Sequence, residues 1–592
     1  MASQDHLYPS SAFDSVYGPS TPPRSIDSGV ISDIKHFSAH VPVEPEPSQP
    51  DVSVYLDAYC AMPKGAGPFP VIILPSPLAP MGWRSYWMGL TYPPGPLPGV
   101  EQPETMSVEV PIIEDGAGLM PGLARAGYIA FAYSERGLAD SKGLIDVAGP
   151  RDQRDGSAVI DFVLDNVPEA APDRIAFAGA SYGAGQSLLI AAHDRRVKAV
   201  AAMSAWADLA AGLFENNTRH MQAFLALRAL FEREPFPPKP DKPTLPHPTY
   251  LNPETALTFE GFTSADYQAH MPELLAFAAE RSPLADGIFE KLNRSDLAIL
   301  LCTYWHETLF SNNKVVEFFN KLSEPAKRLI VQVGDHGAGE VTGLAGLGSR
   351  PTDAMRWWFD HHLKGLGELD GNTVVVEPMY HPLRAADKFP DWETFVRSPQ
   401  RFHLRTPGRE PGSMGLEPDT HAWEYAFTAG VNTEAEVAAA LLKTGQQERL
   451  ALPLRYQTAD ITSEHAVYWR SDLFPQRQRI SGEVRLHLTV KPANTSVTLV
   501  AYLFDVTNGK NDRIVTSAAY TLHNEQANQP TAVDFGFQLT DYDLPPGHSL
   551  LLVVDTQDKF LADESAAGAV TVLHPANGSS YVDIPMGDYQ AP

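Results

Sequence analysis

The chain has 592 residues, of which 43% are hydrophobic and 20% charged, and its formal net charge is −27 at pH 7. This composition is typical of a globular protein, and the length exceeds one ordinary domain, so we expect two or three domains. The negative charge argues against nucleic acid or an anionic membrane as the main partner. The N-terminal residues lack the basic and apolar regions of a secretory signal, and no run of about 18 apolar residues occurs, so we expect a cytoplasmic protein.

The first half of the chain predicts a doubly wound α/β sheet. Residues 1–35, rich in Ser, Pro and Asp, are expected to form an N-terminal arm. An alternating run from about residue 52 is typical of an edge strand. Further along, apolar strand-like runs alternate with helix-like segments, which predicts a mostly parallel sheet. The expected strands cover residues 70–74, 128–133, 175–178 and 197–203, and the expected helices cover residues 118–126 and 156–166. Between them, the Pro-, Gly- and aromatic-rich residues 75–108 predict a long functional loop beside a site.

The alternation stops after residue 207 and resumes near residue 294. Residues 208–293 contain helix-like segments around a proline-rich piece, and we expect them to form a helical cap over the site. Residues 36–207 and 294–390 then form one α/β catalytic domain that the cap divides. In residues 391–592, alternating apolar runs separated by turn signals predict an all-β sandwich, a jelly roll.

One pentapeptide carries the main chemical signal. Residues 179–183 read Gly-Ala-Ser-Tyr-Gly, with an apolar strand before them and an Ala/Leu-rich helix after them. G-x-S-x-G between a strand and a helix is a nucleophile elbow, in which small residues let the two backbones pass close to each other. The sequence therefore predicts Ser181 as a nucleophile at the carboxyl end of a strand.

A serine needs a base and an orienting carboxylate, which in this arrangement follow in the order Asp or Glu, then His. His336, in Gly-Asp-His-Gly directly after an apolar run, is the predicted base. Glu307 is the first carboxylate after the run 297–302 and is the predicted acid. Asp335, beside the base, and Asp296, before the strand, are its competitors; we interpret His306 as a structural neighbour of Glu307.

The oxyanion hole is predicted from the Tyr182 amide and one donor in the loop after residue 74. Pro77 has no N–H, so the Leu78 amide is the candidate for the second donor. Arg136 and Asp140 are interpreted as braces, and the aromatic residues at 83–92 could line an acyl pocket or pack in the core. The histidines are scattered, so we expect no metal and no cofactor. Of the two cysteines, Cys302 lies in an apolar run and is interpreted as a buried structural thiol.

These residues resemble the X-Pro dipeptidyl-peptidase and cocaine-esterase family of α/β hydrolases over roughly residues 40 to 590. The resemblance is carried by residues 124–143, 173–209, WHETLF (305–310), GDHG (334–337) and PPGHSLLLVVDTQD (545–558). It implies an α/β-hydrolase domain with a helical cap, a C-terminal jelly roll, Ser181 as nucleophile and His336 as base. The family usually has Asp where this chain has Glu307. Its better-known esterases also supply an oxyanion-hole tyrosine where this chain has Leu78.

We therefore expect a serine hydrolase that cleaves a small-molecule carboxylic ester, or an amide, through an acyl-enzyme with a Ser-Glu-His triad. Three alternatives stay open: an acyltransferase using the same acyl-enzyme, an X-Pro dipeptidyl-peptidase, and a non-catalytic binding protein. The natural acyl and leaving groups and the oligomeric state, including a homodimer, are left open.

Overall fold

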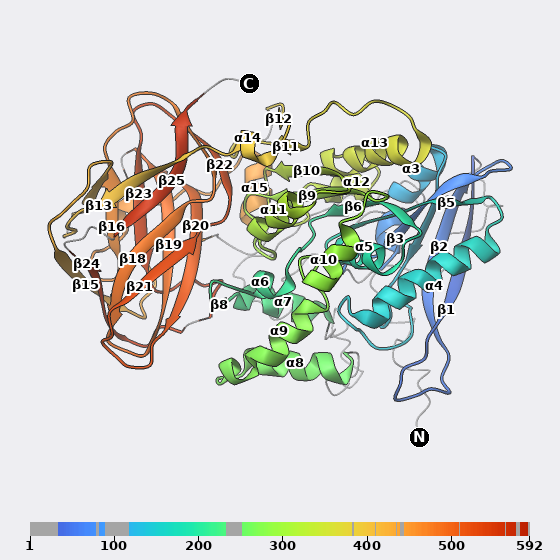
Figure 1. Cartoon of the computed structure of the whole chain (residues 1–592), viewed down its shortest axis with the longest axis horizontal. Coiled ribbons are helices and arrows are strands. Elements are labelled where there is room, and N and C mark those ends of the chain that lie inside the picture. The colour runs from blue at the N-terminus through green and yellow to red at the C-terminus, as the bar shows by residue number, and fades with distance from the viewer. Residues whose placement is uncertain are drawn as a thin grey trace, which may run out of the picture.

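The computed structural model describes residues 33–78, 82–88, 118–231, 251–381, 384–408, 410–433, 435–437, 443–507, 509–562, 564–575 and 580–589. Two bodies lie side by side in it, an α/β body containing the N-terminal half and an all-β body formed by the C-terminal third (Figure 1). The predicted fold class, an α/β-hydrolase sheet with a C-terminal all-β domain, is confirmed.

A ten-stranded sheet forms the centre of the α/β body, in the order β1-β2-β4-β3-β5-β6-β9-β10-β11-β12. The pairs from β4 to β11 are parallel, and β1, β2 and β12 join antiparallel at the two sides. The strands are β1 (Ile34–Val43), β2 (Val54–Pro63), β3 (Phe69–Pro75), β4 (Ile129–Tyr133), β5 (Ala170–Ala180), β6 (Val197–Met203), β9 (Ala298–Tyr304), β10 (Ala326–Gln332), β11 (Val374–Val376) and β12 (Asp387–Phe389). The run from about residue 52 forms a strand, β2, as predicted, but the prediction that it lies at the edge of the sheet is wrong. Strand β1 pairs with its outer side and forms the edge instead.

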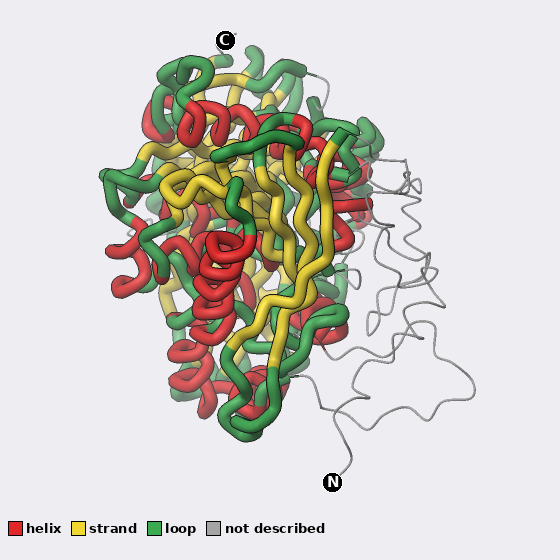
Figure 2. The backbone as a smooth tube through the Cα atoms, turned by 90° about the vertical axis from the view of Figure 1, so that its right-hand side faces the viewer, coloured by secondary structure: helices red, strands yellow, loops and turns green. Residues whose placement is uncertain are grey.

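Helices cover both faces of this sheet, as Figure 2 shows from the α/β end. The central strands are apolar at nearly every position because both of their faces are buried. One face packs against α4 (Pro150–Asn166), α5 (Tyr182–His193), α10 (Asp286–Leu292) and α11 (Asn312–Lys321). The other face packs against α2 (Arg84–Met88), α3 (Leu119–Arg125), α12 (Glu340–Leu344) and α13 (Arg350–Lys364).

The segment between β6 and β9 is mainly helical in its described part. An apolar cluster joins these helices to the residues beside Ser181. The elements are α6 (Leu209–Leu213), the hairpin β7 (Phe214–Glu215) and β8 (Thr218–Arg219), α7 (Met221–Phe231), α8 (Pro253–Thr263), η3 (Tyr267–His270), α9 (Met271–Ala279) and α10. The proline-rich piece, residues 236–248, lies outside the described residues.

The C-terminal body is an all-β domain built on a 13-stranded sheet. Its strands alternate buried and exposed positions, as β18 does, or are buried throughout, as β23 is. The strands are β13 (Pro399–Leu404), β14 (Gly412–Gly415), β15 (Trp423–Ala429), β16 (Val467–Ser471), β17 (Gln478–Gly482), β18 (Arg485–Pro492), β19 (Ser496–Val506), β20 (Arg513–His523), β21 (Thr531–Gly536), β22 (Thr540–Leu544), β23 (Ser549–Asp555), β24 (Gly568–His574) and β25 (Tyr581–Asp588). Short helices α14 (Trp392–Phe395), α15 (Lys443–Arg449) and η4 (Thr458–Asp460) accompany them.

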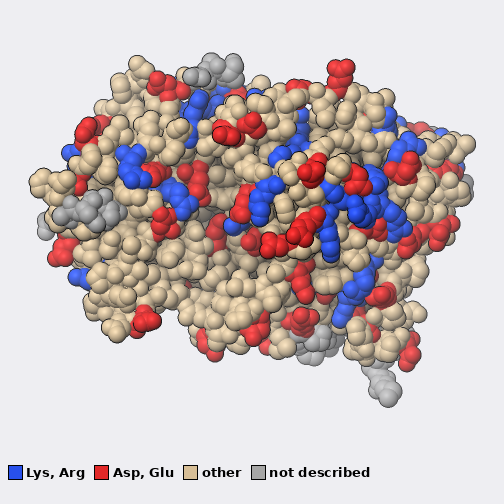
Figure 3. All heavy atoms as spheres, viewed as in Figure 1, with Lys and Arg blue, Asp and Glu red and all other residues tan. Residues whose placement is uncertain are grey.

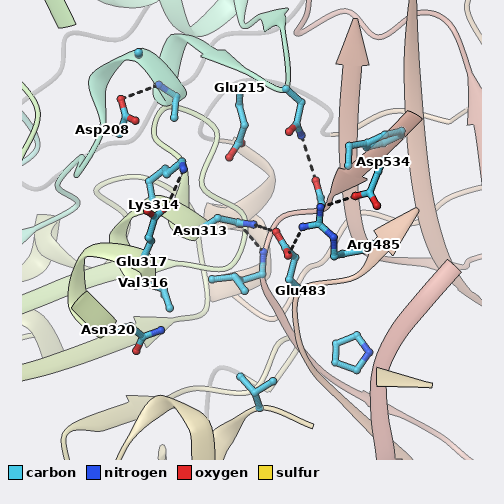
Figure 4. Close-up of a pocket in the computed structure, with 18 of the residues that line it drawn as sticks. Asp208, Glu215, Asn313, Lys314, Val316, Glu317, Asn320, Glu483, Arg485 and Asp534 are labelled. Atoms are coloured by element: carbon cyan, nitrogen blue, oxygen red, sulfur yellow. Dashed lines mark hydrogen bonds and ion pairs between the residues drawn. The ribbon is translucent and has the colours of Figure 1, made fainter. Parts of the chain in front are cut away.

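Polar contacts and a cleft of about 1170 Å³ mark the junction of the two bodies. The side chain of Asn313 donates a hydrogen bond of 3.0 Å to Glu483 and accepts one of 3.0 Å from the Leu539 amide. Figure 4 shows Asp208, Glu215 and Lys314 on one wall of the cleft, with Arg485 and Asp534 on the other. The surrounding surface mixes both signs of charge, and basic side chains lie among acidic ones on the face in Figure 3. Among the described helices, none has the length and apolar character needed to cross a bilayer.

Candidate active site

Ser181 lies at the sharp turn between β5 and α5. Its backbone has φ 57° and ψ −118°, a conformation that non-glycine residues rarely adopt and that is held here by the surrounding structure. Small neighbours are required, because a Cβ on Gly179 would lie 2.3 Å from the Gly183 carbonyl carbon, and a Cβ on Gly183 would lie 2.2 Å from the Pro75 oxygen. The predicted strand, G-x-S-x-G and helix context is present, with the serine side chain half-buried.

The structure brings Ser181, Glu307 and His336 together from the carboxyl ends of β5, β9 and β10. The Nε2 atom of His336 lies 2.8 Å from the Ser181 hydroxyl oxygen. On the other side of the ring, Nδ1 lies 3.1 and 3.2 Å from the two Glu307 carboxylate oxygens. His336 and Glu307 are 7% and 2% exposed, so their pairing is shielded from water.

Electrostatics and backbone contacts both favour this arrangement. Burial by itself lowers the pKa of His336, but the Glu307 carboxylate, followed by the Asp335 and Glu340 charges, raises the pKa overall. Glu307 also accepts the backbone amides of Leu309 and Phe310, at 3.1 and 3.2 Å. The ring of Phe310 meets the His336 ring edge to face, with centroids 5.2 Å apart. The carboxylate and the imidazole are thus each fixed on two sides.

Asp335, the alternative candidate for the acid, makes no hydrogen bond with the His336 ring. Its carboxylate accepts the His336 amide at 2.7 Å, and the amide and hydroxyl of Thr308 at 2.9–3.0 Å. Burial, and then the nearby Glu307 charge, raise the pKa of Asp335 to about 7. Asp335 therefore joins the Glu307 loop to the His336 loop. Asp296 pairs instead with Lys198 and Arg294, and contributes nothing to this geometry.

One of the two predicted oxyanion donors, the Tyr182 amide, lies at the start of α5, and the other, the Leu78 amide, belongs to the loop after β3. Tyr182 is the first residue of this helix, and amides in the first turn point out of the helix end. The loop with Leu78 runs against the same turn, since the Pro75 and Ser76 carbonyls approach Gly183. The Leu78 and Tyr182 side chains share the apolar cluster that extends through Trp206 and Phe310 to the helices between β6 and β9.

The remaining residues that the sequence singled out have structural contacts. Arg136 binds Asp155 and Glu46, and Asp140 pairs with Arg84, so both brace the structure as predicted. Trp83 and Tyr86 are buried in the core against β2, β3 and β4, while residues 89–92 lie outside the described part. Cys302 is a buried free thiol within β9, as expected.

Sequence reasoning missed a buried carboxylate behind His336. Glu340 accepts the Ser204 hydroxyl at 3.0 Å and also the Tyr304 hydroxyl. These hydroxyls in turn accept the amides of Gly337 and Gly339, at 3.0 and 2.8 Å. Glu340 therefore fixes the backbone directly after His336. The sequence signal for this role was a glutamate four residues after the predicted base. Its partners, Ser204 and Tyr304, are distant in the sequence, so the pattern alone does not reveal the contacts.

Comparisons with known proteins agree with this fold. A model of the family described as "X-Pro dipeptidyl-peptidase (S15 family)" matches residues 52–338. A second model, "X-Pro dipeptidyl-peptidase C-terminal non-catalytic domain", matches residues 391–577. No curated protein sequence matches the chain at a significant level.

Three solved structures illustrate the likeness, each over 96% of this chain. An aminopeptidase from a marine sediment Thaumarchaeota archaeon has 14% identity and a TM-score of 0.68 over 99% of its chain. An alpha-amino acid ester hydrolase has 15% identity and a TM-score of 0.65 over 100% of its chain. A CocE/NonD family hydrolase from Staphylococcus aureus has 13% identity and a TM-score of 0.62 over 99% of its chain. At these identities the likeness concerns the fold alone.

Proposed function

Since the chain belongs to the X-Pro dipeptidyl-peptidase family of α/β hydrolases, we propose that it is a serine hydrolase cleaving a carboxylic ester through an acyl-enzyme. The observation that carries this proposal is the line from Ser181 Oγ through His336 to Glu307, with distances of 2.8 and 3.1 Å. Nucleophile, base and orienting carboxylate in hydrogen-bond reach of one another are the arrangement that acyl transfer requires.

In the proposed reaction, Ser181 Oγ attacks the ester carbonyl carbon while His336 Nε2 takes the hydroxyl proton. The Glu307 carboxylate stabilises the imidazolium that forms, and the amides of Tyr182 and Leu78 donate to the developing oxyanion. His336 returns the proton to the leaving alkoxide as the carbon–oxygen bond breaks. A water molecule, deprotonated by the same imidazole, then attacks the acyl-enzyme. His336 returns that proton to Ser181 Oγ as the bond between the acyl carbon and Oγ breaks and the acid leaves.

The surroundings of Ser181 favour an ester of an apolar acid over a peptide with a free amino terminus. An apolar cluster adjoins the site and contains Leu78, Tyr182, Trp206, Leu209 and Phe310. Binding an ammonium group in such surroundings would need a carboxylate partner, since a buried unpaired charge is costly. The carboxylate of Glu307 is already engaged by His336 and two backbone amides. Two further carboxylates lie beside the site, where Asp152 accepts the Tyr182 hydroxyl and Glu135 accepts the Ser76 hydroxyl.

The test compares a p-nitrophenyl ester series with an X-Pro p-nitroanilide on the wild type and on Ser181→Ala. We expect turnover of the esters, loss of that turnover in the variant, and no p-nitroaniline release. Ester turnover that survives Ser181→Ala contradicts the proposed nucleophile. Release from the X-Pro substrate that depends on Ser181 would assign the site to dipeptide cleavage instead.

A further inference from the structure

Helix α15 belongs to the C-terminal domain by sequence but lies against the α/β body, beside the ends of β9 and β10 (Figure 1). The contact is at Gly445, which is buried. A Cβ added there would lie 2.2 Å from the Asp335 nitrogen and 2.3 Å from the Asp335 Cβ. The helix backbone thus rests directly on the residue that precedes His336, and only glycine permits this approach.

Glu448, one turn further along α15, reaches the other loop of the site. One of its carboxylate oxygens lies 2.8 Å from His306 Nε2, and the other accepts the Tyr380 amide at 2.6 Å. His306 immediately precedes Glu307. Burial by itself lowers the pKa of His306, but the Glu448 charge and hydrogen bond, then Asp335, raise it overall. This buried contact therefore connects α15 to the Glu307 loop.

A third contact from the C-terminal domain comes from Gln538, just before β22. Its side-chain amide donates to the Glu307 carbonyl oxygen at 2.8 Å. Gly445 touches the residue before the proposed base, Glu448 binds the residue before the proposed acid, and Gln538 binds the acid's own backbone. All three contacts act on backbone or neighbouring residues, and none touches the reacting atoms.

We propose that α15 and Gln538 are positioning elements of the active site, through which the C-terminal domain holds Glu307 and His336 in reach of Ser181. This inference rests on the proposed function. Its physical basis is the sensitivity of acyl transfer to geometry, because a displacement of about 1 Å costs on the order of 100-fold in rate. The domain whose family model is described as non-catalytic thus sets the rate of the reaction without contacting substrate.

Gly445→Ala tests the contact with the smallest possible change. The added methyl must move Asp335 or α15 by about 1 Å to reach an ordinary contact of 3.4 Å. We expect kcat to fall at least ten-fold with KM little changed, and the second-order rate of fluorophosphonate labelling at Ser181 to fall by a similar factor. The matched control is Gly415→Ala in the same domain, where a Cβ meets nothing within 4 Å; it should keep the wild-type rates.

Glu448→Gln provides a second, independent variant if Gly445→Ala does not fold. It keeps an acceptor for the Tyr380 amide but removes the charge facing His306. We expect kcat to fall several-fold at constant KM, with melting temperature close to that of the exposed control Glu424→Gln. A fall in kcat that merely follows the loss of melting temperature in both variants would overturn the positioning role.

A crystal structure of Gly445→Ala separates this inference from the proposed function. We expect the distance from His336 Nε2 to Ser181 Oγ to lengthen beyond 2.8 Å, whatever the substrate is. An unchanged distance, together with wild-type labelling in both variants, would overturn the inference and leave the proposed function standing. Absence of labelling in the wild type would instead contradict the proposed function itself.

Discussion

The carboxylate of Asp335 accepts both the amide and the hydroxyl of Thr308, at 2.9–3.0 Å, and so joins the loop of Glu307 to the loop of His336. Thr308→Val keeps the shape and the amide but removes the hydroxyl donor. We expect the free energy of unfolding to fall by about 1–2 kcal/mol, because a buried carboxylate loses one hydrogen bond. Urea unfolding measures the change; a stability equal to wild type would contradict the role given to this hydroxyl.

Glu307 is the proposed acid at a position where the family usually has Asp, and its carboxylate accepts the backbone amides of Leu309 and Phe310. Glu307→Gln should lower kcat/KM by about 10³–10⁴, because an amide cannot stabilise the imidazolium. Glu307→Asp withdraws the carboxylate by about 1.5 Å, one carbon–carbon bond, and should cost on the order of 100-fold. Steady-state kinetics with one ester substrate gives both values. Full activity in Glu307→Asp would mean that the loop adapts to either acid.

Glu340 should affect the pH dependence of the reaction. The base acts in its neutral form, so kcat/KM rises as His336 loses its proton. Burial lowers the pKa of His336, and Glu307, then Asp335 and Glu340, raise it, so the acid limb of the profile should lie above pH 6.5. Glu340→Gln removes one negative charge and should move this limb to lower pH. A limb that stays in place or moves upward would contradict this assignment.

Arg136 is 1% exposed and donates to Asp155 at 2.6 and 2.7 Å and to Glu46 at 2.9 Å. Arg136→Ala leaves Asp155 without its cation and Glu46 with Arg151 alone, and we expect it to cost about 3–5 kcal/mol of stability. The control is Arg154→Ala, whose pair with Glu44 is exposed and should cost about 0–1 kcal/mol. Equal denaturation midpoints for the two variants would show that Arg136 does not brace the sheet.

The sequence predicted that Ser181, Glu307 and His336 lie close together because each follows an apolar strand-like run, and the structure brings them within hydrogen-bond distance. Parallel strands bring their carboxyl ends to one edge of the sheet, so local patterns here predict a three-dimensional site. Strand β1 was not predicted, because its sequence, IKHFSAHVPV, mixes polar residues with apolar ones. This mixture fits a strand that pairs on one side only, with β2.

The supporting contacts could not be predicted in the same way. Glu340 meets Ser204 across 136 residues, and Gly445 meets Asp335 across more than a hundred. No local periodicity encodes such contacts, because they depend on how whole elements pack. Trp83 illustrates the same limit: its sequence neighbourhood fits an acyl pocket or a core, and the structure places it against Tyr59 with ring centroids 4.7 Å apart.

The central claim is that Ser181 is an activated nucleophile. Intact-mass spectrometry after treatment with a fluorophosphonate tests it most directly, on the wild type and on Ser181→Ala. We expect one adduct on the wild type and none on the variant, because only a serine paired with His336 attacks phosphorus rapidly. No adduct on the wild type, or the same adduct on both proteins, would contradict it.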